Sequence, residues 1–282
     1  MNDPRARNIS LDEITIRNLE VKYGLDKPWP EQLSLYLRNV ARFEFGDSYA
    51  HQGQSVRGLI LRNWISSFAL GVIVFAIVLV AATGLGILAA LRQGSFVDYV
   101  VIGLATFGAS VPNFVIGILL ILSLSVGLNR LTGGAFSFPS GGFGMDEHLV
   151  LPVMTMSLLP VAFIARLVRS STLEVMRQDY VRTAAAKGAS ERWILIRHVL
   201  KNSLIPVVTA LGPLFAYLIS GSVVVESVFQ IPGIGGLFVN GVNSRDYPVI
   251  IGTVVVFALV IAAANLVVDL VYSLVDPRVR PS

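Results

Sequence analysis

The chain of 282 residues contains no cysteine and only three histidines, at His51, His148 and His198. The absence of cysteine excludes disulfides and thiolate metal or redox sites, and histidines so scattered give no ligand cluster. Charged residues make up only 14% of the chain and hydrophobic residues 54%, with a mean hydropathy of +0.70. This composition leaves too little polar surface to solvate a globule of this size, and it indicates a protein that lies in lipid.

Two further absences limit the function. The sequence has no glycine-rich phosphate loop of the Walker type, so we expect that the chain does not hydrolyse ATP itself and is not an enzyme. We also expect no metal site and no cofactor in this chain. The net charge of +4 fits the topology of a membrane protein better than binding to nucleic acid.

Five hydrophobic stretches are long enough to cross a bilayer, which takes roughly 20 apolar residues in a helix. We therefore predict an all-α polytopic transmembrane bundle. The second stretch exceeds one span and holds Pro112 near its middle, which predicts a kinked, tilted helix or an interfacial turn. In the fourth, the spacing of Gly212, Ala216 and Ser220 predicts close approach to another helix. The stretches cover approximately residues 64–91, 97–128, 149–168, 203–229 and 248–275.

The lysines and arginines orient these spans. They are concentrated in the loop 166–201, which places that loop in the cytoplasm. Counting spans outward from it puts residues 129–148 and 230–247 outside. The same count puts residues 1–63 outside, although this segment is hydrophilic and follows no apolar helix or signal sequence.

Residues 179–206 form a basic, alanine-rich segment between two hydrophobic runs. Its three alanines, 184 to 186, favour a short helix with a closely approachable side, and Lys187 and Gly188 provide a C-terminal stop. Ser190 can cap a second, amphipathic helix, with Glu191 near its positive end. The general alternative is a basic amphipathic loop that lies on lipid headgroups.

The spacing within this segment is more specific. The distinctive residues are Arg182-Thr183-Ala184, Gly188, Arg197-His198 and residues 202–206. With them the segment resembles the cytoplasmic loop of permease subunits of bacterial ATP-binding-cassette importers, in the dipeptide and oligopeptide branch. The wider importer group begins this loop with Glu-Ala-Ala, and the Arg-Thr-Ala form here is that of the peptide branch. The resemblance continues through residues 223–248 to the tail, 276–278.

This resemblance implies a type I importer permease, a multi-pass protein of the bacterial inner (cytoplasmic) membrane. Its partners would be a second homologous permease, two ATP-binding subunits that carry ATP and Mg, and an extracytoplasmic binding protein that delivers di- or oligopeptides. The loop, about residues 170–202, would dock into the ATP-hydrolysing subunit. The residues expected at this contact are Asp179, Arg182, Thr183, Ala184, Lys187 and Gly188.

The external loop 231–236 is too apolar for a free linker and too rich in glycine for a lipid-facing helix. We expect it to fold back over the pathway as an outer gate or a docking surface for the binding protein, with a plain turn between spans as the alternative. Arg245 and Asp246 either contact that protein or pair with each other. The whole expected set is Glu226, Pro232, Gly233, Gly235, Gly236, Arg245 and Asp246.

Permeases of this family begin with one more transmembrane helix, so the resemblance implies that the chain lacks it, through a misplaced start, a truncation or a real variant. Residues 1–63 are then expected to form a small extracytoplasmic helical segment, and residues 64–282 the permease domain. In the last span, Asn265 and Asp269 lie four residues apart, and interhelical hydrogen bonding is the favoured interpretation of both.

Three alternatives remain open. Importers of nickel or glutathione in the same class have very similar permeases, and the binding protein would distinguish them. A proton-coupled secondary transporter would place coupling residues near the midplane of internal repeats, and the sequence shows few carboxylates there and no obvious repeat. A scaffold or assembly factor is the third alternative.

Overall fold

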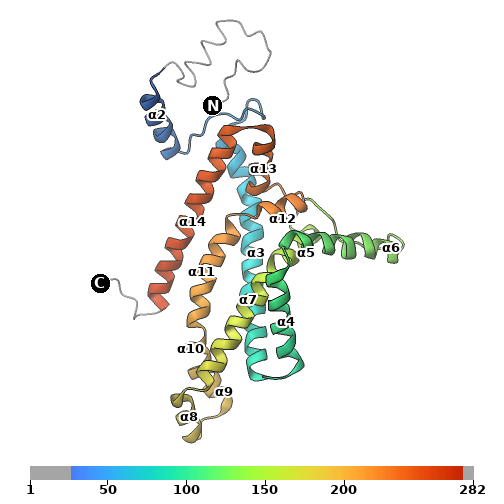
Figure 1. Cartoon of the computed structure of the whole chain (residues 1–282), viewed down its shortest axis with the longest axis vertical. Coiled ribbons are helices and arrows are strands. Elements are labelled where there is room, and N and C mark those ends of the chain that lie inside the picture. Colours follow the sequence, from blue (N-terminus) through green and yellow to red (C-terminus); the bar gives the residue numbers. More distant parts are fainter. Residues whose placement is uncertain (1–26, 276–282) are drawn as a thin grey trace.

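The computed structural model describes residues 27–275, which form a long helical bundle (Figure 1). The predicted tail motif at residues 276–278 and the first 26 residues lie outside this range. The helices are α2 (Trp29–Ala41), α3 (Val56–Leu91), α4 (Phe96–Ser110), α5 (Asn113–Leu120), η2 (Ile121–Gly127), α6 (Leu128–Leu131), η3 (Glu147–Leu149), α7 (Val150–Met176), α8 (Asp179–Ala186), α9 (Glu191–Ile194), η4 (Leu195–Leu200), α10 (Lys201–Ser203), α11 (Ile205–Ile219), α12 (Val223–Val228), α13 (Ile234–Ser244) and α14 (Tyr247–Val275).

Five helical stretches within the described range are long and apolar enough to cross a membrane, which agrees with the predicted all-α transmembrane class. The first of them, α3, begins at Val56, ahead of the predicted start at Trp64. The reason is tertiary packing, because Val56, Leu59 and Ile60 are buried in a cluster with residues of α13 and α14. Hydropathy alone does not detect these turns, since their outward positions are polar.

The second predicted span is two helices instead of one. α4 ends at Ser110, and Pro112 precedes α5, while Val111 takes an extended conformation with φ −108° and ψ 122°. A residue before proline is pushed out of the helical region, which explains the break. Figure 1 shows α5 and α6 running across the direction of α4. The predicted change of direction at Pro112 is therefore confirmed.

The fourth predicted span is also divided. α11 continues through Pro213 and ends at Ile219, and Gly221 adopts φ +97° before α12 begins. The predicted close approach is confirmed at Gly212, where a Cβ would lie 2.0 Å from Cγ1 of Val268 on α14.

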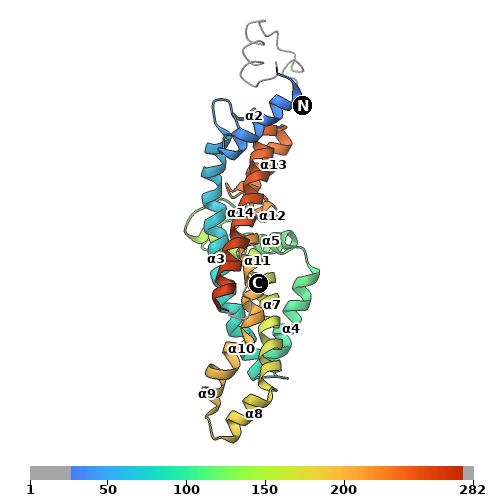
Figure 2. The ribbon, with the colours of Figure 1, turned by 90° about the vertical axis from the view of Figure 1, so that its left-hand side faces the viewer.

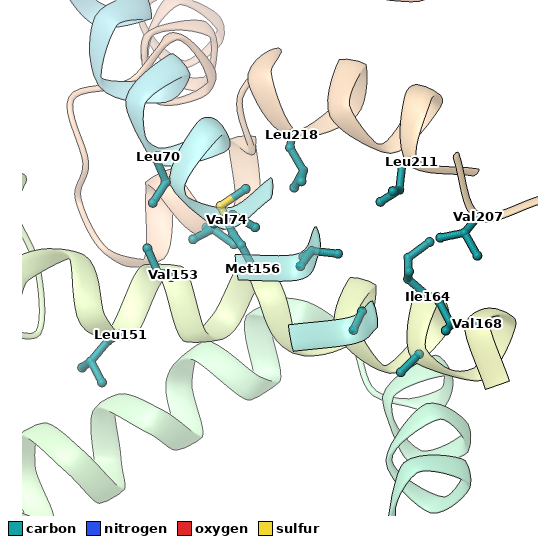
Figure 3. Packing of buried hydrophobic residues seen from close by; sticks show 14 of the residues in the cluster. Leu70, Val74, Leu151, Val153, Met156, Ile164, Val168, Val207, Leu211 and Leu218 are labelled. Atoms are coloured by element: carbon teal, nitrogen blue, oxygen red, sulfur yellow. The ribbon is translucent and has the colours of Figure 1, made fainter. Parts of the chain in front are cut away.

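The core lies between α3, α7 and α11, and Figure 3 shows most of the labelled side chains in the space between these helices, while Leu151 points to the other side of α7. Lipid is as apolar as these side chains, so close packing holds the helices together more than the hydrophobic effect does. Gly86 allows such packing, because a Cβ there would lie 2.5 Å from Cβ of Val168. The core residues labelled in Figure 3 are Leu70, Val74, Leu151, Val153, Met156, Ile164, Val168, Val207, Leu211 and Leu218.

The bundle has two distinct ends. Figures 1 and 2 place α8 and α9 together at one end, which we call the basic end. At the opposite end lie α2, α13 and the first turns of α3, which we call the cap end. In the last span, the side chain of Asn265 is exposed and has no hydrogen bond to the described part of the chain, so the bond predicted for it is not made there. The side chain of Asp269 lies outside what the structure describes.

Candidate functional site

The predicted docking residues lie on one helical hairpin at the basic end, formed by α8 and α9 (Figure 2). The predicted stop is confirmed, because α8 ends at Ala186, Lys187 is its C-terminal cap and Gly188 follows with φ +81°. Residues with a side chain rarely adopt this left-handed conformation. The N–H groups of Gly188 and Ala189 donate to the carbonyls of Ala185 at 2.9 Å and Ala184 at 3.2 Å, which closes the turn.

A small apolar cluster holds the hairpin together. Val181 of α8 is buried against Ile194 of α9 and Val199 of the following turn. Ser190 accepts a hydrogen bond from the N–H of Trp193 at 3.4 Å, which confirms the predicted cap of α9. The shape of the hairpin is therefore determined by contacts within this chain.

The outer face of the hairpin is left open. Oδ1 of Asp179 and Nη1 of Arg182 are 3.9 Å apart, and their side chains are 99% and 72% exposed, so this pair adds little to stability. A Cβ on Gly188 would meet nothing within 4 Å. The same hairpin carries the other residues predicted for this contact, which are Thr183, Ala184 and Lys187.

A groove beside the hairpin was missed by the sequence analysis. It has a volume of about 450 Å³ and is lined by the end of α7 together with Tyr180, His198 and Asn202. Nδ2 of Asn202 donates to the hydroxyl of Tyr180 at 3.1 Å. The half-exposed Trp193 packs edge-on against His198, with ring centroids 4.9 Å apart. Because Tyr180 and Asn202 belong to different helices, no periodicity within one helix indicates their pairing.

A buried carboxyl group organises the loop at the cap end. Glu226 of α12 is only 1% exposed, and its Oε2 accepts from the N–H groups of Gly235 at 2.8 Å and Gly236 at 3.1 Å. Its Oε1 accepts from the N–H of Ser222 at 3.2 Å and from Oγ of Ser67 at 2.8 Å. Glu226 thus caps the N-terminus of α13 and ties it to α3, on which Ser67 lies.

The glycines of the external loop are required by this arrangement. A Cβ on Gly233 would lie 2.2 Å from Oε2 of Glu226, and one on Gly235 would lie 2.6 Å from Cα of Val223. The loop therefore packs these glycines against Glu226 and α12, whereas Pro232, which precedes them, is exposed. This fold-back agrees with the expectation that the loop is neither a free linker nor a lipid-facing helix.

Ser67 was missed as a partner in this network. Besides donating to Glu226, its Oγ accepts from the N–H of Ile234 at 2.9 Å, so one hydroxyl bridges α3, α12 and α13. Its position within a long apolar stretch of α3 gave one available signal, because a polar side chain at such depth requires an internal partner.

Asp246 is buried, whereas its neighbour Arg245 is exposed. Asp246 is 1% exposed, and its Oδ2 accepts from Oγ of Ser48 at 2.5 Å and from the N–H of Ala50 at 3.1 Å. Arg245 is exposed and takes a left-handed conformation, φ +55°, at the end of α13. Within residues 27–275 the two form no ion pair with each other. Asp246 instead ties the segment before α3 to the start of α14.

A second buried charge was also missed. Asp98 of α4 is 2% exposed and receives a bidentate contact from Arg169 of α7, in which Nη2 lies 2.8 Å from Oδ2 and Nε donates to Oδ1. The N–H of Gly94 donates to the same Oδ2 at 2.8 Å. This pair fastens the turn between α3 and α4 to the helix that leads into α8. An aspartate inside an apolar stretch was the signal for it.

The three histidines are dispersed in space as they are in sequence. His51 contacts Ser48 at the cap end, His148 contacts Asp146 before α7, and His198 lies at the basic end. In the part of the chain that the structure describes, no group of three or more histidine or carboxylate residues is placed to hold a metal ion.

Curated relatives match nearly the whole chain. The dipeptide transport system permease protein DppB of Bacillus subtilis is 41% identical over 279 residues, a match that covers 99% of this chain and 87% of that protein. The oligopeptide transport system permease protein OppB of Haemophilus influenzae is 39% identical over 263 residues, covering 93% of this chain and 84% of that protein.

Solved structures of lower identity share the fold. The MetNI methionine ABC transporter in an inward-facing conformation has a TM-score of 0.59 at 18% identity, over 77% of this chain and 96% of that chain. An amino acid ABC transporter has a TM-score of 0.54 at 15% identity, over 78% of this chain and 95% of that chain. The type I importer permease fold that the resemblance implied is thereby confirmed.

The family itself is identified by a model described as "Binding-protein-dependent transport system inner membrane component", which matches residues 82–281. This range includes the basic hairpin, the loop held by Glu226 and the helices that join them. The chain therefore belongs to the family of inner membrane components of binding-protein-dependent transport systems.

Proposed function

We propose that this chain is one of two membrane-spanning permeases of an ATP-driven importer of dipeptides and oligopeptides. The observation that carries the proposal is the basic hairpin, whose shape is fixed internally while its outer face stays exposed. Relatives at 41% and 39% identity are named as dipeptide and oligopeptide permeases, which supports peptides as the cargo.

In this proposal the hairpin inserts into an ATP-binding subunit through Asp179, Arg182, Thr183, Ala184, Lys187 and Gly188. ATP and Mg are held by two such partner subunits, and this chain performs no hydrolysis. Closure of those subunits on ATP pushes the hairpin, and α7 transmits the movement into the core because it packs along α3. The Asp98–Arg169 pair makes α4 move with α7.

At the cap end, the loop 231–236 serves as the outer gate or as the surface that receives an extracytoplasmic binding protein. Glu226 acts from inside this loop, because it is buried and holds Gly235 and Gly236 in place. Among the residues predicted for contact, Pro232 and Arg245 are exposed and are assigned to the binding protein. The bacterial inner membrane is the proposed location, and residues 64–282 are the proposed permease domain.

The test is uptake of a radiolabelled dipeptide and a radiolabelled tetrapeptide by vesicles that contain this chain, its companion permease, the two ATPases and the binding protein. Ala185→Trp adds bulk to the exposed side of α8, and Ala185→Ser is its matched control. We expect ATP-dependent uptake that the tryptophan abolishes and the serine preserves, with equal amounts of both variants in the membrane.

Three results would contradict parts of the proposal. Uptake driven by a proton gradient without the ATPases would make the chain a secondary transporter. Uptake of nickel or glutathione but of neither peptide would keep the importer mechanism and replace the cargo. An unaltered rate in Ala185→Trp would remove the hairpin from the ATPase contact.

A further inference from the structure

A cavity of about 580 Å³ lies where the two broken spans meet α7. Its lining comes from the break between α4 and α5, from the middle of α7, and from the junction of α11 and α12. The volume falls inside the range of about 300–1,000 Å³ that is typical of small-molecule sites. The residues used below are Pro112, Asn113, Pro160, Arg166, Tyr217 and Ser222.

The backbone around this cavity is irregular on three sides. Pro112 lies at the break that separates α4 from α5, and Ser222 lies at the break that separates α11 from α12. Pro160 lies inside α7, where it cannot donate a backbone hydrogen bond to the preceding turn. Irregular backbone at membrane depth is tolerated where it is buried in protein or lines a water-filled cavity. Broken helices around one cavity are the arrangement by which transporters expose backbone groups to a substrate.

The polar side chains of the cavity are few. Ser110 and Ser222 are hydrogen-bonded within their own helices, whereas three others have no such bond among residues 27–275. Arg166 is exposed and has no hydrogen-bond or ion-pair partner among residues 27–275, whereas Arg169, one turn further along α7, is held by Asp98. Oδ1 of Asn113 is buried and accepts no hydrogen bond within the same range. The side chain of Tyr217 is 57% exposed. Arg166 begins the basic segment that the topology places in the cytoplasm, so its side chain lies at the cytoplasmic side of the cavity, where it can bind an anionic ligand.

We propose that this cavity is a transit site for the imported peptide, in which Arg166 binds the C-terminal carboxylate. Guanidinium and carboxylate groups match in a bidentate geometry, which fixes the orientation of the passing peptide. The hydroxyl of Tyr217, a residue that is 57% exposed, pairs with a peptide amide. The rest of the lining is largely apolar, so it accommodates side chains of different kinds. This inference rests on the peptide importer function proposed above.

The absence of cysteine from the chain makes the cavity directly testable. Tyr217→Cys introduces a single thiol into this chain, and Val80→Cys places one on an exposed apolar position of α3 outside the cavity. In the assembled importer we expect a charged, water-soluble thiol reagent to modify Tyr217→Cys and to leave Val80→Cys unmodified. Dipeptide, loaded binding protein and ATP together should slow the modification at least threefold. An unreactive Tyr217→Cys would overturn the proposal, because the second permease would then fill the cavity.

Arg166→Gln and Arg166→Lys test the ligand. Removal of one partner of a desolvated charge pair has a large effect, so we expect the KM for a dipeptide with a free C-terminus to rise about tenfold or more in Arg166→Gln. The KM of Arg166→Lys should lie between those of Arg166→Gln and the parent. The C-terminally amidated dipeptide should be taken up at the same rate by the parent and by Arg166→Gln. Each uptake rate is divided by the fraction of that dipeptide that is bound to the binding protein.

The possible failures are distinguishable. If the parent importer takes up the dipeptide and Arg166→Gln has an unchanged KM, the cavity proposal is wrong and the importer function stands. If the parent takes up neither the dipeptide nor the tetrapeptide under ATP, both proposals fall together.

Discussion

The cap end and the basic end differ in whether their charged residues are buried or exposed. At the cap end, Glu226 and Asp246 are each 1% exposed, and hydrogen bonds to both come from within the chain. At the basic end, Asp179 and Arg182 are 99% and 72% exposed and lie 3.9 Å apart. Buried groups with satisfied hydrogen bonds fix a conformation, whereas exposed charges contribute little to it.

This difference distinguishes charged residues that stabilise the fold from charged residues that contact a partner, which sequence motifs do not distinguish. The charged residues of the cap end shape the surface that other molecules meet, and they act from beneath it. Those of the basic end are themselves the surface, on a hairpin whose shape depends on Val181, Ile194 and the turn at Gly188. Substitutions should therefore impair stability at the cap end and coupling at the basic end.

The largest effect is expected for Glu226→Ala. It leaves the N–H groups of Ser222, Gly235 and Gly236 without their acceptor. Each unsatisfied buried donor costs about 1–3 kcal/mol, so we expect a loss of about 3 kcal/mol or more in the free energy of unfolding. Denaturant titration in mixed micelles measures this change, and proteolysis of the loop 231–236 reports where it occurs.

Glu226→Gln is the matched control, because it keeps the size of the side chain and one acceptor oxygen. The free energy of unfolding of Glu226→Gln should lie between those of the parent and Glu226→Ala. Equal stability of all three proteins would show that the network at the cap end does not hold the loop.

A smaller effect is expected for Asp246→Ala. It removes the acceptor of the Ser48 hydroxyl and of the Ala50 N–H, so we expect a loss of about 2 kcal/mol in the free energy of unfolding. In the double variant with Ser48→Ala the two losses should not add, because they remove the same hydrogen bond. Strict additivity would mean that the two residues act independently.

A third variant tests the turn of the basic hairpin. Gly188 has φ +81°, and a left-handed conformation costs a residue with a side chain about 1–2 kcal/mol. Gly188→Val should therefore disturb the turn, whereas Gly188→Asn should be tolerated better because asparagine visits this region more readily. Hydrogen exchange of residues 184–194 measures the local loss, and identical exchange in both variants would contradict it.

How much of this structure the sequence predicts depends on how far apart in the sequence the interacting residues lie. The existence of five apolar spans, the cap by Ser190 and the stop at Gly188 depend on residues that are close in sequence, and the structure confirms them. The bond between Ser67 and Glu226 spans 159 positions. No periodicity connects residues so far apart, and the direction of a side chain at the end of a helix depends on packing. For the same reason Asp246 could be selected as a candidate while its partners could not.

The same limit applied to the spans themselves. Hydropathy predicted where apolar residues accumulate, but it joined α4 to α5 and α11 to α12, because an apolar run continues across each break. Pro112 gave a local signal of the first break. The second break depends on Gly221, which adopts φ +97° beside the buried Glu226. A glycine between two serines occurs in many kinds of local structure, so it does not by itself predict a helix break.

The smallest effect on stability, and the sharpest test of the comparison, is expected for Arg182→Ala. Its side chain is 72% exposed and its contact with Asp179 is long, so the free energy of unfolding should change by no more than about 0.5 kcal/mol. ATP-dependent uptake should nevertheless fall severalfold, because the residue lies on the face proposed to enter the ATPase. Asp179→Ala provides the companion variant. If uptake drops equally in both and their double variant is no worse, the two side chains act as one contact with the partner subunit. If Arg182→Ala instead destabilises the chain as much as Asp246→Ala does, the basic end relies on its charges for its own shape, and the contrast between the two ends fails.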